Sequence, residues 1–138
     1  MESKLKVGFI CVHNSCRSQI AEAISKIKTN TTFESFSAGT EAGNYINKDA
    51  IRLMKKLYKI DISKQQYSKS INEIPKLDIV ITMGCNVECP WLPSRYREDW
   101  GLDDPTGKSD DFFINIINKI EKKILELENR IRNNEIPM

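Results

Sequence analysis

A short apolar strand that leads directly into an amphipathic helix is the feature that most constrains this chain. Leu5–Cys11 is mostly apolar, as expected for a strand buried on both faces of a sheet. Ser18–Lys28 then repeats apolar residues at the spacing of a helix face. The sequence therefore predicts a strand–loop–helix unit at the start of the chain, with Cys11 at the carboxyl end of the strand.

Further strands and helices alternate after this unit, and no internal repeat or linker divides the 138 residues. Strands are expected at Phe33–Ser37, Leu77–Met83 and Arg97–Trp100, and helices at Asp49–Tyr58 and Asp110–Arg132. Ser109 is placed to N-cap the last helix. The alternation predicts one α/β domain over residues 1–138, with a parallel sheet covered on both faces. In such sheets ligands bind at the carboxyl ends of the strands.

Composition narrows the class of protein. Hydrophobic residues make up 40% of the chain and charged residues 29%, which is typical of a globular domain. A formal net charge of +2 gives no reason to expect a nucleic-acid or membrane partner. No apolar run approaches the roughly 20 residues of a membrane span, and no signal-peptide pattern opens the chain. We expect a cytoplasmic protein whose four cysteines serve catalysis, redox cycling or metal binding.

The loop between the first strand and its helix has the pattern Cys-x5-Arg, from Cys11 to Arg17, followed by Ser18. Backbone N–H groups in a loop at a helix N-terminus converge and bind an anion. The Arg17 fork can hold two oxygens of a tetrahedral anion, and the same positive field favours the thiolate form of Cys11. Ser18 is placed to donate a hydrogen bond to that thiolate. The predicted oxyanion-binding residues are Val12, His13, Asn14, Ser15, Cys16 and Arg17.

Three further segments add to this loop: Arg17-Ser-Gln-Ile-Ala-Glu22, Ser37-Ala-Gly39 and Asp103-Asp-Pro105. With them the chain resembles the low-molecular-weight tyrosine phosphatase superfamily over most of its length. The resemblance implies a three-layer α/β/α fold with a central four-stranded parallel sheet. It also implies that Asn14 holds the loop in shape and that Asp104 is the general acid facing Cys11, with Asp103 as the reserve candidate.

The aspartate loop departs from the phosphatase pattern at one position. Tyrosine phosphatases of this superfamily usually have an aromatic residue after the proline, where it lines the slot for the phenyl ring. This chain has Thr106 after Pro105. The slot for an aryl group therefore lacks that wall. Without the Cys11 loop, the same Asp and Pro residues would indicate only a turn.

A pair of cysteines, Cys85 and Cys89, follows the central strand. A phosphatase needs one cysteine, whereas a reductase needs further thiols as its electron source. The pair resembles that of the arsenate reductases on the phosphatase scaffold, although it is more closely spaced than in the thioredoxin-coupled members. This resemblance implies a relay from Cys11 to Cys85 to Cys89 that reduces arsenate to arsenite for detoxification. It implies no tightly bound cofactor, and electrons from thioredoxin or a low-molecular-weight thiol.

The potassium site of these reductases carries over only in part. Asn14, Glu22 and Ser37 match it, but no residue of this chain is placed as the remaining acidic ligand. A monomer that binds arsenate or phosphate is expected.

Alternatives from other classes stay open. The same loop and acid suit a low-molecular-weight tyrosine phosphatase, in which Cys85 and Cys89 are incidental. A thiol-based redox regulator would use only the cysteine pair. A zinc site could draw on all four cysteines and His13, but Arg17 would repel the cation. His13 is otherwise placed at the entrance of the loop.

Overall fold

The computed structural model describes residues 4–84 and 92–138 and contains a four-stranded parallel sheet. The strands are β1 (Leu5–Cys11), β2 (Phe33–Gly39), β3 (Ile79–Thr82) and β4 (Tyr96–Asp99), in the order β2-β1-β3-β4. β1 lies between β2 and β3, and its residues from Val7 to Cys11 are buried. This burial suits a strand that is covered on both faces. The predicted parallel sheet is confirmed.

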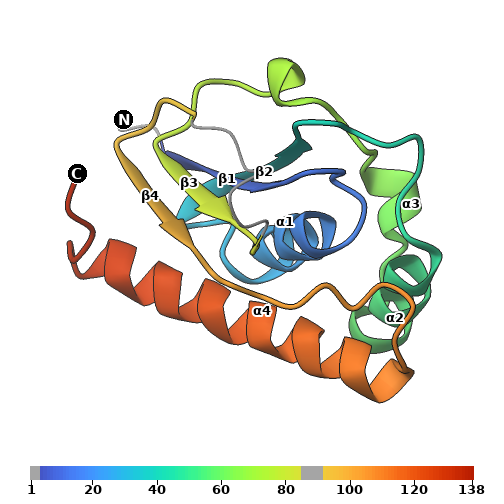
Figure 1. Ribbon diagram of the computed structural model, residues 1–138. Helices are drawn as coiled ribbons and strands as arrows, with labels where there is room; N and C mark the ends of the chain where they lie inside the picture. The colour runs from blue at the N-terminus through green and yellow to red at the C-terminus, as the bar shows by residue number, and fades with distance from the viewer. Residues whose placement is uncertain (1–3, 85–91) are drawn as a thin grey trace.

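The α-helices are α1 (Arg17–Lys28), α2 (Lys48–Tyr58), α3 (Ile62–Gln65) and α4 (Asp110–Arg132), with a 3₁₀ helix, η1, at Ile71–Glu73. Figure 1 shows α4 running along the molecule beside α1, with α2 and α3 at the end where α4 begins. There Arg52 of α2 forms an ion pair with Asp110 at 2.7 Å. No helix in the described ranges is long and apolar enough to cross a membrane.

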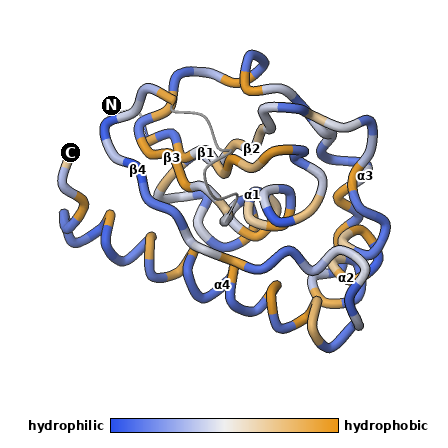
Figure 2. The backbone as a smooth tube through the Cα atoms, viewed as in Figure 1, coloured by the Kyte–Doolittle hydropathy of each residue, from blue (hydrophilic) through white to orange (hydrophobic). Residues whose placement is uncertain are grey.

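Two groups of apolar side chains fill the space on either face of the sheet. The larger one joins Val7 and Phe9 of β1 to the inner faces of α1, α2 and α4. Figure 2 shows the resulting alternation of hydrophobic and hydrophilic turns along α4. The smaller one contains Ile10 and Leu77 and is covered by Ile71 of η1, by Ile74 and by Leu92. The predicted three-layer arrangement is thus confirmed, with η1 the only helix in the second layer among residues 4–84 and 92–138.

Helix ends follow from side-chain capping. The Asn47 carboxamide accepts hydrogen bonds from the backbone N–H groups of Asp49 and Ala50 at the start of α2. Ser109 caps α4 by accepting from the Phe112 N–H at 3.2 Å, as the sequence predicts. The bounds of α4 therefore coincide with the predicted ones.

β3 begins two residues later and ends one residue earlier than the predicted strand Leu77–Met83. Leu77 packs into the smaller apolar group, and the Asp78 carboxylate accepts a hydrogen bond from the Lys6 N–H at 2.8 Å. β2 continues two residues past the predicted end, to Gly39. α3 was not predicted, since four residues are too short to show a helical period.

Gly39 generates a prediction because it is the point where β2 approaches the Cys11 loop. A Cβ at Gly39 would lie 2.5 Å from the Val12 carbonyl oxygen and 3.0 Å from the Asn14 nitrogen, both of them backbone atoms. Gly39→Ala must therefore displace the loop. We expect it to lower the free energy of unfolding by about 1–3 kcal/mol and to weaken phosphate binding. Urea denaturation and calorimetric titration with phosphate measure the two effects.

Gly43→Ala is the matched control. A Cβ there meets only the His13 carbonyl oxygen, at 3.9 Å, which is an ordinary contact. This variant should keep both properties. Equal losses in the two variants would show that close approach at Gly39 is not the cause.

Candidate active site

The Cys11 loop lies at the centre of the carboxyl edge of the sheet. Cys11 is the last residue of β1, which pairs with β2 on one side and β3 on the other. The chain leaves β1 through α1 to reach β2, and β3 adds on the opposite side of β1. This change of direction opens a crevice at the strand ends, where ligands of parallel α/β sheets bind. The predicted nucleophile therefore sits at the expected place in the fold.

The carbonyl groups of the loop point away from this crevice. Those of Cys11, Val12, His13 and Ser15 accept hydrogen bonds from backbone N–H groups in the segment 40–47, at 2.7–3.3 Å. In a trans peptide unit the N–H points opposite to the C=O, so the loop N–H groups turn inward. The N-cap of α1, Cys16, supplies no side-chain acceptor to the first turn of the helix. Loop and helix together present converging donors to an anion.

Two hydrogen-bonding groups contact the thiol of Cys11, a residue that is 5% exposed. The Ser18 hydroxyl lies 3.0 Å from Cys11 Sγ, and the backbone N–H of Asn14 donates to the same sulfur at 3.3 Å. Donors of this kind stabilise a thiolate more than a thiol. The contact between Ser18 and Cys11 is the one that the sequence predicts.

Asn14 is the buried centre of the loop. Its backbone is left-handed, with φ of 52°, a conformation that asparagine tolerates better than most residues. Its amide nitrogen donates to the Ser18 hydroxyl at 2.9 Å, and its carbonyl oxygen accepts from Gln19 Nε2 and from the Lys69 backbone N–H. Asn14 therefore fixes the loop, as the resemblance implies. The contributions of Gln19 and Lys69 were missed in the sequence.

Arg17 joins three segments of the chain. Its Nη1 donates to the Met83 carbonyl at 2.7 Å and to the Leu102 carbonyl at 2.6 Å. Met83 lies two residues before Cys85, and Leu102 two residues before Asp104. The guanidinium has five N–H donors in a planar fork, so the Nε–Nη2 edge is the part suited to an anion.

The space in front of Cys11 is small. It has a volume of about 50 Å³ and is lined by Cys11, Val12, His13, Ser15, Cys16, Arg17, Asp104 and Thr106. Pockets for drug-sized ligands measure roughly 300–1,000 Å³. The site therefore suits a tetrahedral oxyanion better than a large molecule.

Asp104, and not Asp103, lines this space. The Asp104 carboxylate accepts hydrogen bonds from the backbone N–H of Thr106 at 3.1 Å and from its hydroxyl at 2.7 Å. A carboxyl group that lines the pocket beside the thiol can protonate an oxygen that departs from it. The geometry thus favours Asp104 over the reserve candidate.

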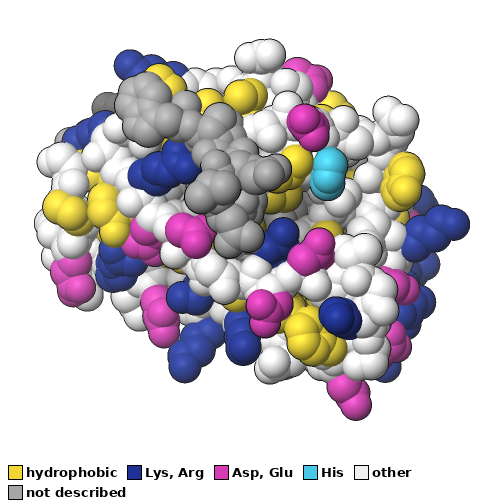
Figure 3. All heavy atoms as spheres, in the orientation of Figure 1, with side chains coloured by type: hydrophobic (Ala, Val, Ile, Leu, Met, Phe, Trp, Pro, Cys, Tyr) yellow, Lys and Arg dark blue, Asp and Glu magenta, His cyan; other side chains and the backbone are white. Residues whose placement is uncertain are grey.

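Two other loop residues, Cys16 and His13, differ in their burial. Burial raises the pKa of the Cys16 thiol far above its ordinary value, so Cys16 is protonated at neutral pH. His13 is exposed, and its Nδ1 lies 3.2 Å from the Glu41 carbonyl oxygen. Figure 3 shows the histidine side chain on the surface of the molecule.

Cys85 and Cys89 lie outside the described residues. They are also two of the four cysteines on which the alternative zinc site would draw. Among the residues described, no three His, Cys, Asp or Glu side chains are grouped as metal ligands. The residue before the pair, Gly84, is held by its N–H, which donates to Asp99 Oδ1 at 2.9 Å. Its φ of 98° requires glycine.

Arg17→Lys tests whether the site needs the guanidinium fork. The substitution keeps the positive charge, but an ammonium cannot bond both carbonyls and hold two anion oxygens. We expect phosphate affinity to fall by about 10–100-fold, by loss of charge-assisted hydrogen bonds of roughly 1.5–3 kcal/mol. Calorimetric titration measures it. Arg52→Lys, on an exposed ion pair that does not line the Cys11 pocket, should bind phosphate normally.

Comparison with known proteins agrees with this geometry. Residues 6–136 match the family "Low molecular weight phosphotyrosine protein phosphatase". An arsenate reductase of Brevibacillus brevis is 41% identical over 112 residues, covering 78% of this chain and 82% of the relative. A solved arsenate reductase in the phosphate-binding state superimposes with a TM-score of 0.81 at 34% identity, covering 92% of this chain and 98% of that one.

A thioredoxin-dependent arsenate reductase of Corynebacterium glutamicum superimposes with a TM-score of 0.75 at 29% identity, covering 96% of this chain and 64% of that one. These matches extend over nearly the whole chain, and they agree with the loop and the sheet described above. This protein belongs to the low molecular weight phosphotyrosine protein phosphatase family.

Proposed function

We propose that this chain is an arsenate reductase, which converts arsenate to arsenite through a thiol relay that starts at Cys11. Its relatives in sequence and structure bear that name. The observation that carries the proposal is the bond from Arg17 Nη1 to the Met83 carbonyl. It brings the chain that leads into Cys85 against the wall of the Cys11 pocket.

The first step joins arsenate to the loop. Converging N–H groups and the Arg17 fork bind the oxyanion, and the Cys11 thiolate attacks arsenic. Asp104 donates a proton to the departing oxygen, which leaves as water. The product is a Cys11–arsenic(V) thioester.

The second step moves two electrons to arsenic. The Cys85 thiolate attacks Cys11 Sγ, a Cys11–Cys85 disulfide forms, and the electron pair of the broken sulfur–arsenic bond stays on arsenic. Arsenic leaves as arsenite. Cys89 then attacks Cys85, which frees Cys11 and forms a Cys85–Cys89 disulfide.

An external thiol reductant must reduce that disulfide. The Corynebacterium glutamicum relative is described as thioredoxin-dependent. Thioredoxin is therefore the electron donor we propose, with a low-molecular-weight thiol as the other source. A cytoplasmic setting suits this chemistry, because thiols there are kept reduced.

Thr106 favours arsenate over an aryl phosphate. It lines the small pocket at the position where phosphatases of this family usually place an aromatic side chain, and its hydroxyl is bonded to Asp104. A short polar side chain offers no stacking surface for a phenyl ring.

Cys85→Ser separates reduction from hydrolysis. The variant should give no multiple turnover of arsenate with thioredoxin, thioredoxin reductase and NADPH, because the relay lacks its second thiol. Its hydrolysis of an aryl phosphate should equal that of the wild type, since hydrolysis needs only the Cys11 loop and Asp104. NADPH consumption measures arsenate reduction, and release of the phenol measures hydrolysis of the aryl phosphate.

Other outcomes identify the alternatives. Fast aryl phosphate hydrolysis with no arsenite from the wild type, with either thioredoxin or a small thiol, would identify a phosphatase. Normal arsenate turnover in Cys85→Ser would overturn the relay. A Cys85–Cys89 disulfide that forms equally well without arsenate, and with no arsenite product, would identify a redox regulator.

Asp104→Asn tests the acid. Loss of a positioned general acid lowers rates by about 10²–10⁴-fold, and we expect that loss in single-turnover arsenate reduction. Asp103→Asn is the matched control, because it removes an equal charge from the adjacent residue, which does not line the pocket. A larger loss in Asp103→Asn would reverse the assignment.

A further inference from the structure

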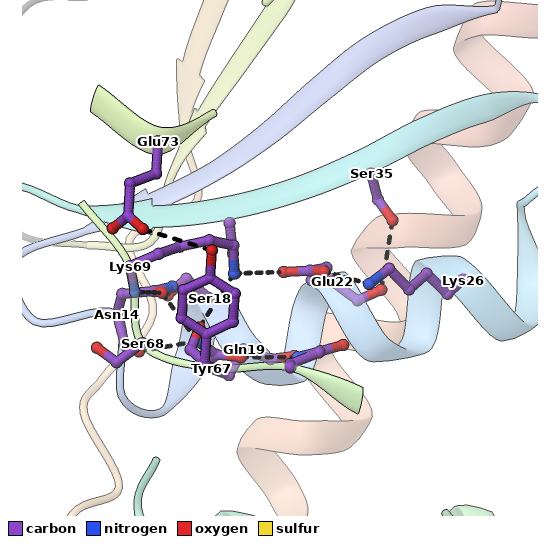
Figure 4. A network of polar contacts seen from close by, with 12 residues as sticks. Asn14, Ser18, Gln19, Glu22, Lys26, Ser35, Tyr67, Ser68, Lys69 and Glu73 are labelled. Atoms are coloured by element: carbon purple, nitrogen blue, oxygen red, sulfur yellow. Dashed lines mark hydrogen bonds and ion pairs between the residues drawn. The ribbon is translucent and has the colours of Figure 1, made fainter. Parts of the chain in front are cut away.

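Behind the Cys11 loop lies a buried carboxylate, that of Glu22 in α1 (Figure 4). Its side chain is 5% exposed. It accepts a hydrogen bond from the Ser37 hydroxyl at 2.5 Å and forms ion pairs with Lys26 and Lys69. A buried charge is stable only when it is paired and hydrogen-bonded, and Glu22 has both kinds of partner.

This is the place where the resemblance to arsenate reductases implies a potassium ion, held by Asn14, Glu22 and Ser37. The residues present do not fit such an ion. The Lys69 ammonium lies 3.4 Å from Glu22 Oε1, with a side chain only 10% exposed. The same ammonium donates to the Tyr67 carbonyl at 3.1 Å. A buried positive charge already stands beside the carboxylate, and it would repel a second cation.

Lys69 also reaches the nucleophile through its backbone. Its N–H donates to Asn14 Oδ1 at 2.9 Å, and Asn14 in turn bonds the Ser18 hydroxyl that lies against Cys11 Sγ. Its carbonyl accepts from the Gly39 N–H at 2.9 Å, at the point where β2 meets the loop. The ammonium thus anchors, through Glu22, the segment that supports the loop from behind.

We propose that Lys69 is a tethered internal cation that takes the place of the potassium ion, so that the oxyanion loop keeps its shape without a monovalent metal. Lys69 is a positioning residue, because it acts on Cys11 through Asn14 and Ser18. The proposal concerns anion binding by the loop and does not depend on whether the chain reduces arsenate.

The wild type supplies the first test. Its thermal midpoint and its phosphate affinity should be the same in potassium chloride and in choline chloride at equal ionic strength. A dependence of either quantity on potassium would overturn the proposal. Neither measurement uses arsenate, so this result is separate from that of the reductase assay.

Lys69→Gln supplies the second test. It removes the ammonium and leaves an amide oxygen near the oxygens of Glu22 and Ser37, which together suit a cation. In choline chloride we expect phosphate affinity to fall about tenfold, the size of loss seen when a group that orients a ligand is removed. Potassium should restore it. An unchanged affinity, or a loss that potassium does not restore, would overturn the proposal.

Lys26→Gln is the matched control, because it removes the other ammonium bound to Glu22. The Lys26 side chain is 45% exposed, so water replaces it. This variant should keep its phosphate affinity and show no response to potassium. If Lys69→Gln does not fold, the comparison of potassium with choline in the wild type decides: indifference supports the proposal, and dependence overturns it.

Discussion

The hydrogen bonds of the Asn14 side chain are the interaction on which the rest of the site depends. Asn14 is fully buried and holds a left-handed backbone, so its amide must be satisfied inside the protein. It is satisfied by three residues from two parts of the chain: Ser18 and Gln19 of α1, and Lys69. Because these partners come from different parts of the chain, the loop is shaped by the fold as a whole.

Arg17 adds the connection toward the reacting groups. Its two carbonyl partners belong to the segments that lead to Cys85 and to Asp104. One side chain thereby holds the Cys11 loop against the segments that lead into Cys85 and into Asp104. Holding reacting groups in a fixed geometry can by itself lower the activation barrier of a reaction substantially.

The local parts of this arrangement could be predicted from the sequence. β1, α4 and the loop from Cys11 to Ser18 are recognised by hydrophobic period, capping and spacing within a few residues. What was missed depends on contacts between distant residues. Lys69 reads as an ordinary surface lysine until the fold buries it beside Glu22, and the carbonyl partners of Arg17 are 66 and 85 residues away. No local pattern encodes such pairs. The start of β3 was misjudged in a similar way, since Asp78 bonds the Lys6 N–H, which lies 72 residues away along the chain.

The distance along the chain between Arg17 and Leu102 also bears on biosynthesis. An N-terminal segment of this protein emerges from the ribosome with its cysteine and arginine but without the carbonyls that align the guanidinium. The face of α1 that packs against α4 is likewise uncovered until the last helix is made. The complete set of polar contacts around Cys11 and Arg17 therefore arises only once nearly the full chain has been synthesised. In the nascent chain Cys11 stands without the Arg17 bonds to Met83 and Leu102, and both bonds form only when the distant segments fold against the loop.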